Sequence, residues 1–159
     1  MKSFFLFFIL VTCMTISCSK IDIDIDRTTF DKEYAAWNAQ NIENYTFTFD
    51  YRSGGGPNGP ITIALDSNEP VIIDNRTPQL VPIATSISEI YSYINETFDN
   101  IERQKNSSNK RFTIESISLR INYNKQFHYP EKVSYRVSYK QKLEGQPHYN
   151  LNITEFVLN

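Results

Sequence analysis

The sequence predicts an α+β fold in which an antiparallel β-sheet has two helices packed on one face, in the order α-β-β-β-α-β-β-β. Two segments repeat apolar residues at helical spacing, and each precedes three segments in which apolar and polar residues alternate. The connections between the alternating segments are short, which favours antiparallel pairing. The order indicates two similar halves, without a sequence repeat that would establish a duplication.

The first predicted helix covers residues 28–41, where Thr28 and Thr29 can cap the first turn. Its apolar residues recur at spacings of four and three and therefore form one stripe. Trp37 ends this stripe, and we expect it to anchor the core.

The clearest predicted strand covers residues 44–52 and has an aromatic row on one face. The row consists of Tyr45, Phe47, Phe49 and Tyr51. An aromatic row can stack on sugars or bases, but one face of this strand must be buried, and this is its only apolar face. We therefore expect the row in the core. Two shorter strands are predicted over residues 61–65 and 71–73, after a glycine-rich hairpin tip.

The second half begins with a helix whose start carries a capping box made by Ser86 and Glu89. Its apolar face continues until the polar run over residues 104–110. A strand begins near Phe112, and its alternation changes phase at Glu115, which predicts a bulge or a break.

A predicted hairpin over residues 117–139 organises the core. Apolar and polar residues alternate on both of its arms, and the turn-forming sequence NKQFHYP lies between them. Such a strand pair has one apolar and one polar face. A last strand is predicted over residues 149–157.

The N-terminus has the features of an export signal. Lys2 supplies a positive charge, and residues 4–11 form an unbroken apolar run. This run is shorter than the roughly 20 apolar residues that a membrane-spanning helix needs. Residues 1–17 are therefore predicted to be a cleaved signal peptide.

The end of this segment, Thr-Ile-Ser-Cys at residues 15–18, resembles the lipobox of bacterial lipoproteins, although Thr15 stands where leucine is usual. A rival site at Cys13 would leave only residues 1–12 as the signal. The resemblance implies a diacylglyceryl group on Cys18, loss of Cys13 with the signal, and no disulfide. Several acyl chains hold a domain stably on a membrane. We expect an envelope location, in the outer membrane, with the face of the membrane left open.

Residues 18–27 are interpreted as the lipidated cysteine and a solvated tether, because acidic residues alternate through them. Four acids also match part of a calcium-loop spacing: Asp22, Asp24, Asp26 and Glu33. Arg27 occupies the position where such a loop needs glycine, which argues against calcium. Residues 28–159 then form a single domain.

Composition and motifs give no sign of catalysis. The formal net charge of −2 and the scattered basic residues provide no footprint for nucleic acid. His128 and His148 fall in predicted turns, without carboxylates nearby in the sequence at the spacing of a metal site or an acid–base pair. No serine lies in a G-x-S-x-G motif. We predict no catalytic residue, no metal site and no cofactor.

Four short motifs stand out between residues 30 and 140: a tryptophan, an Asn-Tyr-Thr-Phe strand, a helix start at residues 85–91 and a hairpin at residues 121–133. The residues that carry them include Trp37, Tyr45, Phe47, Tyr123, Tyr129 and Pro130. Together they resemble an uncharacterised family of bacterial secreted lipoproteins, domain of unknown function 6174. Asn124 stands for the aspartate of that family and His128 for its glycine. The resemblance implies the fold and an envelope location and carries over no catalytic residue.

We therefore expect a lipid-anchored, non-enzymatic binding domain of the cell envelope. Its partners would be the membrane, through the lipid on Cys18, and an envelope protein or ligand. One alternative is an envelope hydrolase or carbohydrate-binding module that uses the aromatic strand and loop acids. Another is an inhibitor of an envelope or secreted enzyme.

Overall fold

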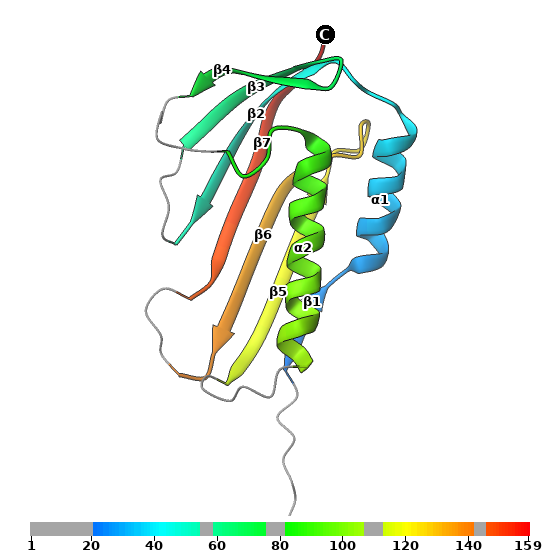
Figure 1. Cartoon of the computed structure of the whole chain (residues 1–159). Helices are drawn as coiled ribbons and strands as arrows, with labels where there is room; N and C mark the ends of the chain where they lie inside the picture. Colours follow the sequence, from blue (N-terminus) through cyan, green and yellow to red (C-terminus); the bar gives the residue numbers. More distant parts are fainter. Residues whose placement is uncertain (1–20, 55–58, 76–81, 107–112, 142–145) are drawn as a thin grey trace, which may run out of the picture.

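The computed structural model describes residues 21–54, 59–75, 82–106, 113–141 and 146–159 (Figure 1). The predicted signal peptide, Cys13 and the predicted lipidation site Cys18 lie outside these residues.

Seven strands form one sheet in the order β1-β5-β6-β7-β2-β3-β4 (Figure 1). The two helices are α1 (Arg27–Ala39) and α2 (Ile87–Asn106). The strands are β1 (Asp22–Ile25), β2 (Tyr45–Ser53), β3 (Gly59–Asp66), β4 (Glu69–Asn75), β5 (Ile114–Tyr123), β6 (Pro130–Tyr139) and β7 (His148–Leu158). Strands β2 to β4 and β5 to β7 each form an antiparallel meander, and the pairing of β7 with β2 joins the two.

The predicted element order is wrong, although the α+β class is correct. The observed order is β-α-β-β-β-α-β-β-β, because residues 22–25 form strand β1. This strand pairs in parallel with β5, so the sheet is mixed and not wholly antiparallel as predicted.

The tether prediction failed because the alternation of acids and isoleucines fits both a solvated segment and a two-faced strand. In the structure, Ile23 and Ile25 lie opposite Ile117 and Leu119, which are buried. Asp22 and Asp24 alternate with them and are exposed. The apolar face of this short segment therefore extends the core.

Both helices pack against the same face of the sheet. Ring centroids lie 5.0 Å apart between Phe30 of α1 and Phe98 of α2, and 5.6 Å apart between Trp37 and Tyr45 of β2. The buried residues of the strands, among them Phe47, alternate onto this face. The other face is lined mainly by serine, threonine, asparagine and charged side chains, and neither helix covers it.

The starts of the two helices were predicted with different success. Asp26, and not a threonine, is the N-cap of α1: its Oδ1 accepts from the backbone N–H of Thr29 at 2.9 Å. The predicted cap of α2 by Ser86 is present, because the backbone N–H of Glu89 donates to Ser86 Oγ at 3.1 Å, but the return bond of the capping box goes to the residue before Ser86. The Glu89 carboxylate accepts in return from the backbone N–H of Thr85.

Each of the six predicted strands overlaps an observed strand, β1 was not predicted, and the predicted start near Phe112 lies outside the described residues. The predicted irregularity at Glu115 is confirmed, because the pairing of β5 with β6 shifts register between Ile114 and Ser116. The predicted hairpin consists of β5 and β6, which pair along most of their lengths.

Candidate functional site

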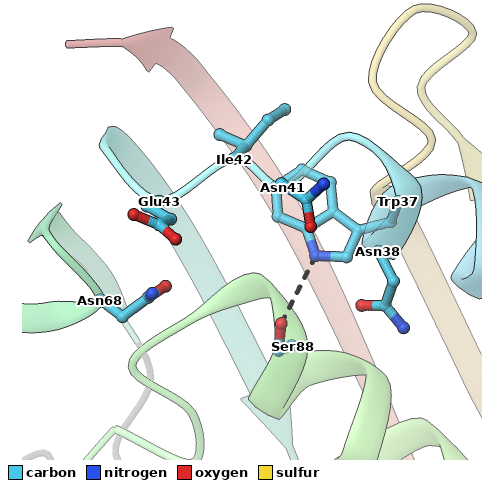
Figure 2. Close-up of a pocket in the computed structure, with 7 residues that line it drawn as sticks. All are labelled: Trp37, Asn38, Asn41, Ile42, Glu43, Asn68 and Ser88. Atoms are coloured by element: carbon cyan, nitrogen blue, oxygen red, sulfur yellow. Dashed lines mark hydrogen bonds between the residues drawn. The ribbon is translucent and has the colours of Figure 1, made fainter.

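Two surface features could contact a ligand: a polar hollow beside Trp37 and an apolar corner at one edge of the sheet. The hollow lies where four segments meet, at the end of α1, the connection to β2, the turn between β3 and β4, and the start of α2 (Figure 2). Its volume is about 180 Å³, below that of clefts that enclose drug-sized ligands. Its lining consists of Trp37, Asn38, Asn41, Ile42, Glu43, Asn68 and Ser88.

The hollow offers polar groups for hydrogen bonding: three neutral carboxamides and the carboxylate of Glu43. Its three carboxamides and the carboxylate of Glu43 make no side-chain hydrogen bond within the described part of the chain. Trp37 Nε1 donates to Ser88 Oγ at 3.4 Å (Figure 2). The indole is only 4% exposed, because it packs edge-on against Tyr45 and Phe156. The ring therefore offers no open face on which a sugar could stack.

The apolar corner is formed by strand β4 and the end of β7. It consists of Val71, Ile72, Ile73, Val157 and Leu158, whose exposed fractions are 58%, 44%, 61%, 57% and 48%. Val71 lies opposite Ala64, Ala64 opposite Thr46, and Thr46 opposite Val157. This row crosses three strand spacings, or about 14 Å.

The topology explains why these residues are exposed. Strand β4 is last in the sheet order and pairs only with β3 among the described strands. Neither helix lies in front of β4 (Figure 1). One side of its backbone therefore has no described strand partner, and the apolar side chains that follow one another along it face solvent.

The charged groups of this edge have a single sign. In β3, β4 and the turn between them, every described charged residue is acidic, namely Asp66, Glu69 and Asp74. The apolar residues of β4 therefore lie between carboxylates.

The motif residues of the sequence lie mostly in the aromatic core. Tyr45 connects Trp37 to Phe47, with centroid distances of 5.6 and 5.8 Å. Phe156 then stacks on both Tyr45 and Tyr129, at 5.4 and 4.6 Å. Pro130 is buried as well, whereas Tyr123 is half-buried and stacks on Tyr91. Trp37, Tyr45, Phe47 and Tyr129 therefore belong to one aromatic cluster, and Trp37 also lines the surface hollow.

The tyrosine hydroxyls of the core have structural roles. Tyr45 Oη accepts from the backbone N–H of Ile87 at 3.0 Å and so satisfies a donor at the start of α2. Burial raises the pKa of Tyr45 to about 12. Burial also raises the pKa values of Tyr91, Tyr93 and Tyr149, so these phenols stay protonated to a higher pH than exposed tyrosines do. The aromatic row of β2 is therefore not a ligand surface, because its first three members are buried.

Sequence reasoning missed a contact between His128 and Glu33. Their Nδ1 and Oε2 atoms lie 2.7 Å apart, although the residues are 95 positions apart in the chain. Tyr91 Oη donates to the backbone oxygen of His128, and Gln40 Nε2 donates to that of Phe127. These contacts attach the β5–β6 turn to both helices. His128 has a φ of 62°, which explains why glycine suits this position.

His148 is exposed as predicted, but it is the first residue of strand β7 and not part of a turn; its Nδ1 lies 2.8 Å from the backbone oxygen of Gln146. Within the described residues, no three histidine, cysteine or acidic side chains are grouped so that they could hold a metal ion. Neither described helix combines the length and hydropathy that a membrane crossing requires.

Comparison with known families matches residues 29–146 to DUF6174, a family of unknown function. The chain belongs to this family. No curated protein and no solved structure matches the chain. Membership in DUF6174 therefore identifies an uncharacterised domain and assigns no activity.

Proposed function

We propose that this DUF6174 protein is an exported, lipid-anchored protein of the bacterial envelope that binds another envelope protein and does not catalyse a reaction. One observation supports the binding role above others: strand β4 exposes three consecutive large apolar residues, Val71, Ile72 and Ile73. Contiguous apolar surface of this kind marks interaction sites on soluble domains.

The anchor rests on the sequence features at Cys18. Cys18 and Asp22 are four positions apart, so the chain between the lipid and β1 spans at most about 14 Å. The β1 edge is therefore held near the membrane. Strand β4 lies six strand spacings away, or about 29 Å across the sheet. This arrangement leaves the apolar corner accessible to a partner.

The anchor is tested by expressing the full-length protein in a lipoprotein-producing bacterium and measuring the intact mass of the mature chain. We expect an N-terminal Cys18 with acyl groups, and radiolabelled palmitate incorporated by the wild type but not by Cys18→Ser. Cys13→Ser is the matched control and should label normally. A mature chain that retains residues 1–17 or carries no lipid would contradict the proposed lipid anchor.

The binding role is tested by photo-crosslinking in intact cells of the native host. A benzophenone amino acid is placed at position 73 in the apolar corner, at position 41 in the hollow, or at position 134 on the polar sheet face. We expect a discrete adduct with a second protein from position 73 and none from position 134. Absence of an adduct from all three positions would contradict a protein-binding role.

A second candidate function, carbohydrate binding, is supported by the free carboxamides of the hollow. Titration with N-acetylglucosamine tests it, with Asn41→Ala as the variant and Asn150→Ala on the polar sheet face as the control. Binding that Asn41→Ala abolishes would favour this function over protein binding.

The third alternative, inhibition of an enzyme, differs from the leading proposal only in the identity of the partner. It predicts that the adduct from position 73 contains an enzyme whose activity the purified protein lowers at one-to-one stoichiometry. An adduct with a protein that has no enzymatic activity would contradict a role as an enzyme inhibitor.

A further inference from the structure

We propose that strand β4 accepts an extended segment of the partner as an added β-strand, and that this segment is apolar in its centre with basic residues at its ends. This inference rests on the protein-binding role above and names the surface and the chemistry of the partner.

Strand β4 is at the end of the sheet and pairs only with β3 among the described strands. An edge strand presents unpaired N–H and C=O groups that template the addition of another strand. Proteins usually blunt such edges with charges, proline or bulges. Here Pro70 lies near the start of the strand, and a register shift leaves Ile73 without a partner in β3. Because Pro70 has no N–H, an added strand would pair with the residues after it.

Apolar side chains are exposed on both faces of this edge of the sheet. Ile72 lies opposite Ile63, whose side chain is buried on the helix-covered face of the sheet. Val71 lies opposite Ala64, on the other face. Each is more than two-fifths exposed. A strand added beside β4 would therefore cover apolar groups on both faces, which a loop contact on one face would not.

The charged residues around β4 indicate the chemistry of the added segment. The acids Asp66, Glu69 and Asp74 border the apolar residues, and no basic residue lies in the described parts of β3, β4 or their turn. Lysine or arginine at the ends of the added strand complements these carboxylates. A second copy of the chain fits less well, because one antiparallel register of β4 with itself places Glu69 directly opposite Asp74. Like charges in directly opposite positions destabilise strand pairs.

The test uses the full-length protein in detergent micelles and a short synthetic peptide in which threonine and valine alternate between two terminal lysines. Calorimetry should show one saturable site of low affinity, as for small transient interfaces. The same peptide with terminal glutamates should bind at least tenfold more weakly, and a central proline should abolish binding.

Two variants assign the site. Ile73→Lys and, separately, Ile73→Thr should each weaken binding, by at least tenfold and about threefold respectively, whereas Ser134→Lys on the polar face of β6 should bind as the wild type does. Circular dichroism establishes that each variant is folded. The threonine variant keeps the test decisive if the lysine variant does not fold.

Three results would overturn the proposal: a peptide affinity that the Ile73 substitutions do not weaken, equal affinity for the lysine-flanked and glutamate-flanked peptides, or no binding of either peptide. Sedimentation that shows a dimer lost in Ile73→Lys would instead identify the occupant as a second copy. If the peptide fails but position 41 still forms a protein adduct in cells, protein binding stands and strand addition at β4 falls.

Discussion

The two edges of the sheet differ in length, pairing and surface. Strand β1 has four residues, pairs in parallel with β5 and exposes Asp22 and Asp24, while its isoleucines are half-buried. Strand β4 has seven residues and exposes three consecutive apolar side chains. A short strand with outward acids is a protected edge; β4 also carries a proline, acids and a register shift, but its three apolar side chains stay exposed between Pro70 and Asp74. The comparison indicates that one edge completes the domain and the other is available to a partner.

The largest loss of stability should come from substitutions in β5 and β3, the strands next to the two edges. Ile117 of β5 and Ile63 of β3 are both fully buried. Substitution of either by alanine should lower the free energy of unfolding by about 3 kcal/mol, because a cavity forms in a packed core. Urea denaturation measures both. If Ile63→Ala, but not Ile117→Ala, lowered the free energy of unfolding by less than about 1 kcal/mol, loose packing and not an open edge would explain the exposure of β4.

A smaller loss of stability should come from substitutions in β1 itself. Replacing Ile23 and Ile25 together by serine should lower the free energy of unfolding by about 2 kcal/mol, because both side chains are half-buried and Ile25 packs against the core. The control replaces Asp22 and Asp24, which are exposed, and should change it by less than about 0.5 kcal/mol. Equal costs for the two double variants would contradict the assignment of β1 to the fold.

Asp26 joins β1 to α1, and its pKa is lowered because its side chain accepts hydrogen bonds from Thr29. Its stabilising contribution is therefore complete above the unfolded pKa of 3.8 and is lost as the pH falls through the lower folded value. Asp26→Asn keeps an acceptor but does not titrate. The urea midpoint of the wild type should exceed that of this variant at pH 7, and the difference should disappear at about pH 2. A constant difference across this range would contradict capping by the carboxylate.

The smallest effect should come from the ion pair that connects β1 to β5. Arg120 Nε lies 2.9 Å from Asp24 Oδ2, but the two side chains are 76% and 59% exposed. A double-mutant cycle with alanine should give a coupling below about 0.5 kcal/mol, because solvent screens exposed pairs. A coupling above about 1 kcal/mol would show that charge, and not apolar burial, holds this edge.

Local patterns predicted most of the secondary structure. The cap of α2 by Ser86, the aromatic strand β2 and the β5–β6 hairpin each depend on residues close together in the sequence. Strand β1 could not be predicted in the same way, because its partner β5 lies more than 90 positions later and four alternating residues fit a tether equally well.

The candidate site depends still more on tertiary structure. The sequence predicts a short strand at residues 71–73, and the exposure of its side chains follows only from the place of β4 at the end of the sheet, where no helix lies in front of it. The hollow beside Trp37 joins four separate segments, and the pair of His128 with Glu33 spans 95 positions. Neither feature leaves a local pattern in the sequence.

The central claim is that β4 is the partner-binding edge and β1 is not. Solution NMR of the full-length protein in detergent micelles with the lysine-flanked peptide tests it most directly. We predict intermolecular nuclear Overhauser contacts between the peptide backbone and Val71, Ile72 and Ile73, in the pattern of paired strands, with none to the β1 residues. Contacts to Asp22–Ile25, or to the residues around Trp37 in place of β4, would contradict the claim.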